Sequence, residues 1–480
     1  MNFIGRKNEL SRLDKFYKDN LSHCALIYGR RRIGKSELIK ESMKNSGISG
    51  IYYESKQTSE KNNLESLSEI LSELLNLPKL AFNSFEELLN FLFNYHSGKT
   101  FILVLDEYPY LRNVINGLDS IIQNLIDKYN EKTNFKLIIC GSFIDTMKSL
   151  LSAQNPLYGR VDLTLNLKQM DYYDSSMFYS SFSNEDKVRL YSVFGGIPYY
   201  NRLIDSNKSV KGNIIELIAS TDARLAMEVS MNLKSEISKI INANEIFEVL
   251  AKGFSRYKDI LSQSHVPSSP TLADVLEKLI KMEIIKKEAP INDENNKKKA
   301  GYYIYDNLSL FYYKYIFNHT SQMNVMTSEK FYDKYINDDF ESQYVPRAFE
   351  QVCKEYLIRQ NLTGTIEESF DKIGKYYYDD PATKSNGEFD IVTYSDKGYV
   401  FYEAKFINEP ISNKIVAKEI EQVNHAGLNC YKYGFISKNG FKNVRNNSII
   451  KISLNDLFQS FWRRVNQAYQ VVFEILILVY

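Results

Sequence analysis

The stretch GRRRIGKS, residues Gly29 to Ser36, decides how the first part of this chain folds. It follows the apolar run CALIY (24–28) and leads into the helical pattern KSELIKESMK (35–44). A glycine, four residues and Gly-Lys-Ser between a strand and a helix have the spacing of a phosphate-binding loop. Backbone N–H groups at the helix start then face phosphate oxygens, Lys35 reaches the β- and γ-phosphates, and Ser36 coordinates Mg²⁺.

The interior of this loop leaves one alternative open. Its three arginines either face the bound nucleotide or are solvated. Gly29 and Gly34 allow the backbone to approach a ligand closely. The predicted cofactor-binding residues of the loop and the first helical turn are Gly29, Arg30, Arg31, Arg32, Ile33, Gly34, Lys35, Ser36 and Glu37.

A second motif, FILVLDE (101–107), predicts a buried strand that ends in two carboxylates. Beside the phosphate loop, Asp106 is expected to hold Mg²⁺ through water, and Glu107 to orient or deprotonate the attacking water. The alternative is a solvated strand end. The run KLIICGS ends in Ser142, which either contacts the γ-phosphate or its water, or caps a helix.

Composition indicates an ordered protein of several domains. At 480 residues, with 44% hydrophobic and 25% charged residues, the chain is too long for one core. A formal net charge of +1 excludes a chain-wide attraction to nucleic acid or to an anionic membrane. Any such binding must therefore rest on local patches.

The cysteines argue against a disulfide framework or a zinc site, because they are far apart and form no C-x-x-C pair. Cys24 and Cys140 are expected on neighbouring strands with Cα atoms on the order of 10 Å apart, beyond disulfide reach. The longest apolar run, 469–480, is too short to span a bilayer. We therefore expect a reduced, cytoplasmic protein without a membrane partner.

Periodicity divides the chain into segments. Strand-type runs at 24–28, 49–53, 101–105 and 136–140 alternate with helical stretches, which predicts a parallel sheet. Residues 245–306 predict three helices and a hairpin, the order of a winged helix. The predicted segments are 1–165, a phosphate-loop core; 166–244, mostly helical; 245–320, winged-helix-like; and 341–465, a third core with strands and helices.

The order of motifs along the first 320 residues resembles the prokaryotic, archaeal-type AAA-like ATPases, close to signalling ATPases of the STAND class. The resemblance rests on FIGRKNEL (3–10), the phosphate loop, LDEYPYL (105–111), NPLYGR (155–160) and GGIPYY (195–200). It implies a P-loop NTPase domain, built on a parallel sheet, that hydrolyses ATP with Mg²⁺. It also implies a helical lid after residue 165. It also implies that Gly5 and Arg6 approach the adenine side of the site.

Arg160 lies in the turn-rich segment NPLYGR. Its guanidinium either reaches a nucleotide, on its own or on an adjacent subunit, or forms a surface salt bridge. An oligomer is therefore possible without being determined by the sequence.

The last segment places acidic residues on two apolar runs. GEFDIV (387–392) carries Asp390, and YVFYEAKF (399–406) carries Glu403 and Lys405. Alternate strand positions share one face, so Glu403 and Lys405 point together. With Asp390 they suit Mg²⁺ binding and water activation against a phosphodiester, and Glu350 on the preceding helix adds a fourth group.

This segment, roughly 341–455, resembles the PD-(D/E)xK nuclease superfamily, in the form of the C-terminal domain of unknown function that follows this ATPase type. The resemblance implies a restriction-endonuclease-like α/β core and DNA as a partner. No Pro-Asp dipeptide directly precedes the motif, so the match covers only the carboxylate–lysine core. The alternatives are an active metal site, an inactive scaffold, and a surface ion pair.

The middle segment is ambiguous between nucleic-acid contact and packing. Lys286, Lys287 and the run 297–299 on the predicted wing either track phosphates or form a solvated hairpin tip. Helix 271–282 mixes lysines with Asp274 and Glu277, which is unfavourable for a recognition helix.

The leading hypothesis is an ATPase whose nucleotide cycle moves the lid and winged helix relative to a nuclease-like domain that acts on or binds DNA. One alternative is a nucleotide-gated regulatory or DNA-binding switch with an inactive terminal domain. Another is a nucleotide-binding scaffold without turnover. No function follows from the apolar tail 470–480.

Overall fold

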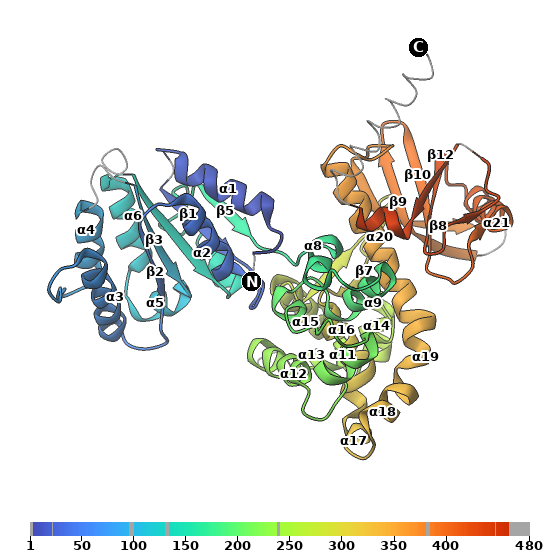
Figure 1. Cartoon of the computed structure of the whole chain (residues 1–480), viewed down its shortest axis with the longest axis horizontal. Helices are drawn as coiled ribbons and strands as arrows, with labels where there is room; N and C mark the ends of the chain where they lie inside the picture. The colour runs from blue at the N-terminus through green and yellow to red at the C-terminus, as the bar shows by residue number, and fades with distance from the viewer. Residues whose placement is uncertain are drawn as a thin grey trace, which may run out of the picture. The chain divides into compact units, whose positions relative to one another are not determined.

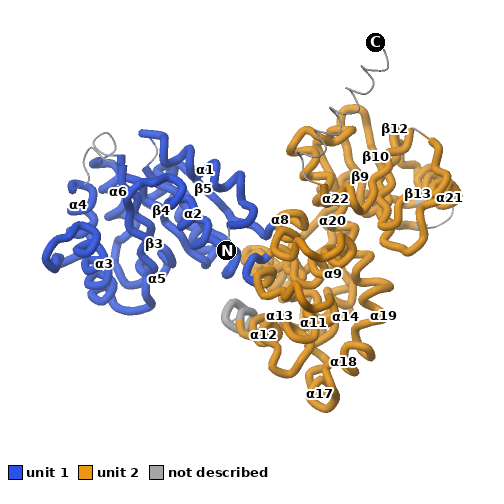
Figure 2. Tube along the Cα trace, in the orientation of Figure 1, with its two compact units in different colours: residues 1–170, 197–199 blue, residues 171–196, 200–480 orange. Residues whose placement is uncertain are grey.

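The computed structural model describes residues 3–21, 23–95, 100–129, 134–237, 241–380, 385–446 and 448–459. The tail 470–480 lies outside these residues. The chain divides into two compact units, coloured separately in Figure 2. Unit 1 comprises Met1–Met170 and Ile197–Tyr199, and unit 2 comprises Asp171–Gly196 and Tyr200–Tyr480.

Unit 1 is built on a parallel five-stranded sheet of order β2-β3-β4-β1-β5 (Figure 1). Its strands are β1 (Cys24–Tyr28), β2 (Gly50–Glu54), β3 (Phe101–Asp106), β4 (Phe135–Gly141) and β5 (Leu163–Asn166). The first four confirm the predicted strand runs. The α/β class with a parallel sheet is therefore confirmed for this unit.

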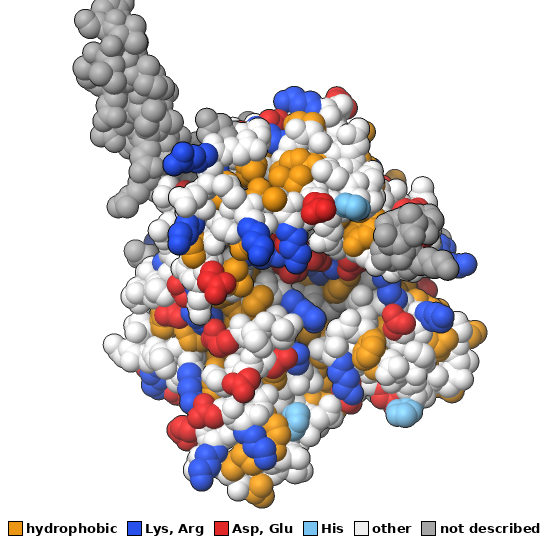
Figure 3. Space-filling model, turned by 90° about the vertical axis from the view of Figure 1, so that its right-hand side faces the viewer, with side chains coloured by type: hydrophobic (Ala, Val, Ile, Leu, Met, Phe, Trp, Pro, Cys, Tyr) orange, Lys and Arg blue, Asp and Glu red, His pale blue; other side chains and the backbone are white. Residues whose placement is uncertain are grey.

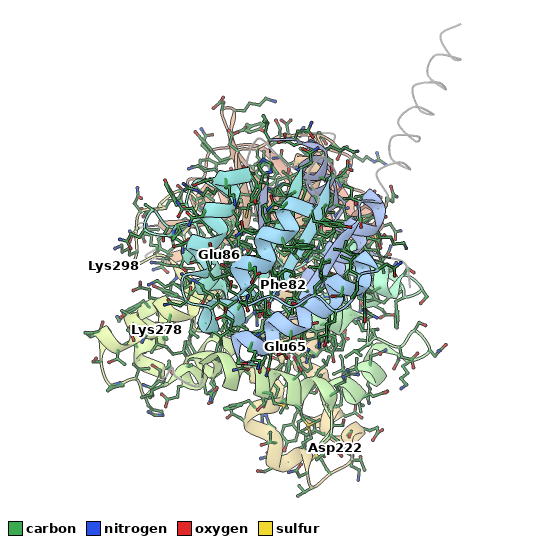
Figure 4. The ribbon with its side chains drawn as sticks, turned by 90° about the vertical axis from the view of Figure 1, so that its left-hand side faces the viewer. Glu65, Phe82, Glu86, Asp222, Lys278 and Lys298 are labelled. Atoms are coloured by element: carbon green, nitrogen blue, oxygen red, sulfur yellow. The ribbon has the colours of Figure 1, made fainter. Side chains whose placement is uncertain are left out.

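Helices flank this sheet, and β1, β3 and β4 are buried along their whole length. Strands covered on both faces read as continuous apolar runs, which explains why they stood out in the sequence. The helices of the unit are α1 (Lys7–Lys18), α2 (Lys35–Ser46), α3 (Glu60–Leu75), α4 (Phe85–Tyr95), α5 (Tyr108–Val114), α6 (Leu118–Tyr129) and α7 (Ile144–Ser149). Figure 4 shows α3, which bears Glu65, and α4, which bears Glu86, lying side by side in front of the sheet.

The register separates the two sheet cysteines as expected. Cys24 is opposite Leu137, and Cys140 is opposite Ile27, three steps further along β4. Cys24 belongs to the core cluster that α3, α4 and α6 cover. All four cysteines are free thiols.

Unit 2 begins with helices. The segment after residue 170 contains α8 (Tyr172–Ser176), η1 (Met177–Tyr179), α9 (Asn184–Phe194), α10 (Pro198–Asn201, shared with unit 1), α11 (Val210–Leu217) and α12 (Arg224–Ile237). The next segment has the predicted order of three helices and a hairpin: α13 (Ala243–Ala251), α14 (Tyr257–Gln263), α15 (Ser269–Lys281), β6 (Ile285–Glu288) and β7 (Gly301–Ile304). β6 and β7 pair antiparallel.

A helical stretch rich in aromatic residues connects this hairpin to the last sheet. Its side chains are mostly buried, as predicted for core aromatics. It contains α16 (Asn307–Phe311), η2 (Tyr312–Ile316), η3 (Phe317–His319), α17 (Thr320–Met323), α18 (Ser328–Tyr335), α19 (Asn337–Asp339), η4 (Phe340–Tyr344) and α20 (Val345–Leu362).

The C-terminal part of unit 2 is a mixed sheet of order β14-β12-β10-β9-β8 (Figure 1). β8, β9 and β10 are antiparallel, whereas β10, β12 and β14 are parallel. The elements are β8 (Lys372–Asp380), β9 (Ser385–Ser395), β10 (Gly398–Lys405), β11 (Ile411–Ser412), α21 (Asn413–His425), β12 (Cys430–Ser437), β13 (Phe441–Lys442), β14 (Ile449–Ser453) and α22 (Leu454–Phe458). Across the described residues, no helix combines the length and apolarity needed to cross a membrane.

Candidate functional site

The phosphate loop lies between β1 and α2, where the sequence predicts it. Gly29 packs so closely that a Cβ atom there would lie 2.4 Å from the carbonyl oxygen of Leu167. Gly34 has a φ of 90°, in the left-handed region that favours glycine, and it caps α2. Both glycines are therefore required by the loop geometry, and the N-terminus of α2 opens directly onto the loop.

The side chains of Lys35 and Ser36 bond to the loop and to the end of β3, and their predicted roles on phosphate and Mg²⁺ stay predictions. The ammonium of Lys35 is buried and donates to the carbonyls of Gly29 at 2.9 Å and Arg30 at 3.1 Å. The hydroxyl of Ser36 donates to Asp106 Oδ2 at 2.8 Å. The loop and the end of β3 therefore meet, as the opposed motifs predict.

Asp106 is buried in a shell of donors. Burial alone would raise its pKa, but hydrogen bonds from Tyr52, Cys140, Ser36 and the Glu107 N–H outweigh burial and lower the pKa. The carboxyl group therefore stays ionised. One hydroxyl and one carboxylate form the kind of hard-oxygen donor set that Mg²⁺ prefers.

Tyr52 is a member of this site that sequence reasoning missed. Its hydroxyl donates to Asp106 Oδ2 in a short hydrogen bond. β2 pairs with β3 so that Tyr52 lies opposite Val104, two residues before Asp106 and on the same sheet face. This relation becomes visible only when the strand register is known.

Glu107 and Ser142 are joined directly. The Ser142 hydroxyl donates to the Glu107 carboxylate, with distances of 3.1 and 3.0 Å to the two oxygens. Glu107 itself has a φ of 50° and precedes α5, so a strained backbone aims its side chain. Ser142 therefore bonds to Glu107. Neither of the two roles predicted for Ser142 includes this contact.

Two further residues of the loop, Arg31 and Arg32, lie over aromatic rings of unit 1. The guanidinium of Arg31 lies 5.6 Å from the centre of the Phe143 ring, and that of Arg32 lies 4.0 Å from the Tyr199 ring. Arg32 has a φ of 65° and Glu37 is exposed.

Arg6 is tied to the phosphate loop. Its guanidinium donates to the carbonyls of Ile33 at 3.2 Å and Lys168 at 2.6 Å, and it pairs with Glu9 at 3.1 Å. Gly5, which precedes it, has a φ of 69°. The structure thus places both residues next to the loop, and their approach to adenine stays a prediction.

Arg160 does not lie at the phosphate loop of its own chain. It makes a bidentate ion pair with Asp127 of α6, in which both N–O distances are 2.9 Å. It precedes β5, whose Leu163 pairs with Ala25 near the start of β1, whereas the loop follows the end of β1. Because the strands are parallel, the guanidinium lies at the N-terminal ends of the strands and the loop lies at their C-terminal ends. Of the alternatives for Arg160, the structure shows the salt bridge, and a contact with a nucleotide on an adjacent subunit stays a prediction.

In unit 2, β9 and β10 bring the predicted acidic pair together. Tyr402 is opposite Ile391, so the next step along the ladder brings Glu403 beside Asp390 on one face. Lys405 pairs with Glu403 and, at 3.1 Å, with Glu419 of α21. Burial raises the pKa of Glu403, and the charge of Lys405 only partly offsets that effect.

Asp390 has a partner that the sequence did not reveal. Lys375 of β8 pairs with it at 2.9 Å and with Glu388 at 2.8 Å. Lys375 lies in a β-bulge between Gly374 and Tyr376. A bulge breaks the alternation of faces, so no periodicity in the sequence places Lys375 beside Asp390.

Glu350 of α20 lies within electrostatic range of these carboxylates. Burial raises its pKa, and the charges of Asp390 and Glu403 raise it further. Within the described parts of the chain, however, no three His, Cys, Asp or Glu side chains are grouped closely enough to hold a metal ion. In this conformation the predicted metal set of Glu350, Asp390 and Glu403 is not assembled, and lysines pair with two of its carboxylates.

The charges of the winged-helix-like segment are largely paired among themselves. Ion pairs join Lys278 to Asp274, Lys281 to Glu277, Lys286 to Glu288 and Lys299 to Asp293. Figure 4 shows Lys278 and Lys298 at the surface. Figure 3 shows basic and acidic side chains interspersed over one face of the molecule.

Two protein families match this chain. Residues 3–203 match an ATPase domain found predominantly in Archaea, and residues 312–422 match a domain of archaeal and bacterial proteins of unknown function. The Walker-type ATPase PABY2304 of Pyrococcus abyssi has a similar fold, with a TM-score of 0.50 at 18% identity over 65% of this chain and 96% of that chain.

Two relatives come from Methanocaldococcus jannaschii. The ATP-binding protein MJ0147 is 24% identical over 42% of this chain and 68% of its own length. The protein MJECL04 is 30% identical over 95% of this chain and 99% of its own length. The chain therefore belongs to the same family as MJECL04, and it carries an archaeal-type P-loop ATPase domain followed by a C-terminal domain shared by archaeal and bacterial proteins of unknown function.

Proposed function

We propose that this protein binds and hydrolyses ATP in a Mg²⁺-dependent reaction. The observation that carries the proposal is the 2.8 Å hydrogen bond between Ser36 and Asp106, which joins the phosphate loop to the end of β3. A triphosphate bound at the start of α2 would draw Lys35 from the loop carbonyls onto its β- and γ-oxygens. Ser36 and Asp106 would hold Mg²⁺, which neutralises the developing charge.

In this proposal Glu107 orients or deprotonates the attacking water. Ser142 holds the Glu107 carboxylate through its hydroxyl, so Ser142 positions the base. The lid (166–244) and the winged-helix-like segment (245–320) respond to the nucleotide, with Arg32 and Tyr199 in contact at the loop.

The test is ATP turnover by the full chain. Lys35→Ala is expected to abolish hydrolysis, and Glu107→Gln to lower kcat by about 100-fold or more while ATP still binds. Lys44→Ala, at the exposed far end of α2, is the matched control. Wild-type turnover in both Lys35→Ala and Glu107→Gln would contradict the proposal.

We further propose that the ATPase is coupled to a nuclease-like C-terminal domain, residues 341–465, that acts on DNA. Asp390 beside Glu403 and Lys405 supports this part of the proposal. The test is incubation with plasmid DNA and Mg²⁺ or Mn²⁺, with and without ATP. Glu403→Ala is expected to abolish cutting, and Glu409→Ala, exposed beyond β10, is the control.

A second candidate is a nucleotide-gated, DNA-binding switch whose terminal domain is inactive. The pairing of Asp390 with Lys375 favours this candidate, because a lysine occupies the place that a metal ion would take. It predicts nucleotide-dependent DNA binding without cutting under any metal condition. Cutting that Glu403→Ala removes would eliminate it.

A further inference from the structure

The loop between β6 and β7, residues 289–300, lies along the edge strand β8. Its Ile291 N–H donates to the carbonyl of Lys375 at 2.8 Å. The Asn292 side chain then bonds to both backbone groups of Tyr377: its amide donates to the carbonyl at 2.7 Å, and its oxygen accepts from the N–H at 3.1 Å. The loop therefore satisfies an exposed strand edge in the manner of an added strand.

Side-chain packing strengthens this contact. Ile291 packs against the core cluster of the last sheet, which includes Phe389 and Val392. A Cβ atom on Gly374 would lie 2.7 Å from Ile291 Cγ2. Gly374 therefore makes the space that Ile291 occupies. Lys372 also pairs with Glu294 of the loop at 2.9 Å.

The same interface extends to the acidic pair through Lys375. The Lys375 ammonium lies 5.5 Å from the centre of the Tyr303 ring on β7. Arg256, whose backbone bridges to Gly301 at the start of β7, pairs with Glu388 at 2.9 Å. Glu388 in turn pairs with Lys375. The hairpin side thus contacts Lys375 itself through Tyr303 and one of its two ion-pair partners, Glu388, through Arg256.

Held in this way, Lys375 neutralises Asp390. Its ammonium lies 2.9 Å from Asp390 and 2.8 Å from Glu388, so it is held between the two carboxylates. A divalent cation that approached Asp390 would have to displace an ammonium 2.9 Å away. The ion pair between Lys375 and Asp390 is consistent with the finding that the acidic pair forms no metal-binding group among the described side chains.

We propose that the β6–β7 loop is an intramolecular clamp that holds Lys375 on Asp390 and thereby keeps the Asp390–Glu403 site closed to divalent cations. Release of the loop uncovers β8 and lets Lys375 leave Asp390. Only the functional consequence of the clamp rests on the proposed nuclease-like role. The contacts of the clamp do not depend on any DNA chemistry.

The first measurement is hydrogen–deuterium exchange on the full chain. The Tyr377 amide is bonded to Asn292, so Asn292→Ala is expected to speed its exchange about tenfold, as the loss of ordinary side-chain hydrogen bonds implies. Lys298→Ala, an exposed residue of the same loop, is the control and should leave exchange unchanged.

Gly374→Ala provides an independent variant that leaves the sequence of the loop unchanged. The added methyl group should displace Ile291 and speed Tyr377 exchange. In the double variant Gly374→Ala with Ile291→Ala, the clash is gone, so exchange should be no faster than in Ile291→Ala alone. Additive effects would overturn the packing part of the clamp.

The second measurement is Mn²⁺ binding by calorimetry without nucleotide. Because apparent affinity falls with the fraction of molecules in the open state, Mn²⁺ affinity should rise by the factor by which the clamp opens, about tenfold in Asn292→Ala. Adding Asp390→Asn should remove this gain, which separates the site from any metal bound at the phosphate loop.

The outcomes separate the clamp from the nuclease proposal. Unchanged Tyr377 exchange in Asn292→Ala overturns the clamp. Faster exchange with unchanged Mn²⁺ affinity overturns its role as a gate. Faster exchange with tighter Mn²⁺ binding supports the clamp, and if plasmid DNA then remains uncut, the nuclease proposal fails while the clamp stands.

Discussion

The hydroxyl of Ser142 donates to the carboxylate of Glu107, 3.1 and 3.0 Å from its two oxygens, and so joins the end of β4 to the start of α5. In a sheet of parallel strands, this places a donor beside the carboxylate that we propose activates water. The proposed base is therefore held before any substrate arrives.

We expect Ser142→Ala to lower kcat for ATP about fivefold with little change in KM, because a lost positioning hydrogen bond is worth about 1 kcal/mol. Ser142→Thr retains a hydroxyl and should restore most of the rate. Steady-state kinetics checks this prediction. A raised KM with normal kcat would instead make Ser142 a group that binds substrate and transition state equally.

Tyr52→Phe should make the ATPase more sensitive to acid. Removing the Tyr52 hydroxyl deletes one of the hydrogen bonds that lower the pKa of Asp106, so that pKa rises. Activity that needs ionised Asp106 is then lost at a higher pH than in the wild type. The measurement is kcat/KM against pH at fixed Mg²⁺.

The control for that profile is Tyr53→Phe. The Tyr53 hydroxyl bonds to Asn63 and not to Asp106. The acid limb of the pH profile of Tyr53→Phe should therefore match that of the wild type. An unshifted limb in Tyr52→Phe would show that the hydrogen bond to Asp106 is not maintained in the working enzyme.

Arg160→Ala should lower turnover if the arginine acts on a neighbouring chain, since the phosphate loop of its own chain lies at the opposite ends of the strands. Mixing Arg160→Ala with Glu107→Gln should then restore activity above that of either variant, because a mixed pair contains one intact interface. Turnover measured across mixing ratios checks this. Normal activity of Arg160→Ala would leave only its salt bridge with Asp127.

Glu355 predicts a pH dependence of stability in unit 2. This carboxyl accepts hydrogen bonds from the Tyr172 N–H at 3.0 Å and from the Tyr191 hydroxyl at 2.9 Å. Burial raises its pKa from 4.5 to about 7. Between those values the folded state binds more protons than the unfolded state, so its contribution to stability falls as pH rises from about 4.5 to 7.

Glu355→Gln should therefore raise the Tm of unit 2 at pH 8 and not at pH 5. At pH 8 its effect on the free energy of unfolding should be on the order of a few kcal/mol. Scanning calorimetry of the full chain at both pH values is the measurement. An equal shift at the two pH values would mean that packing, not ionisation, separates the variants.

Much of unit 1 was predictable because its signals are local. Apolar runs such as 101–105 mark buried parallel strands, and the glycine spacing of 29–36 marks the turn between β1 and α2. These patterns reflect burial and backbone conformation, which neighbouring residues largely determine. β5 was missed, because LTLN is short and only half-buried.

The missed site residues have a different origin. Tyr52 meets Asp106 only through the register of β2 on β3. Lys375 meets Asp390 only because a bulge turns it toward that carboxylate, and Glu419 reaches Lys405 from a helix. Each contact joins elements whose alignment depends on packing across the whole domain.

The residues along the chain were sufficient to establish a phosphate loop, an opposing carboxylate pair and a second acidic pair on adjacent strands, because each depends on short-range spacing. Which side chains bond to those carboxylates depended on tertiary structure. Charges interact through space at a few ångströms, and only the packed strands and the docked β6–β7 loop bring Tyr52 to Asp106 and Lys375 to Asp390.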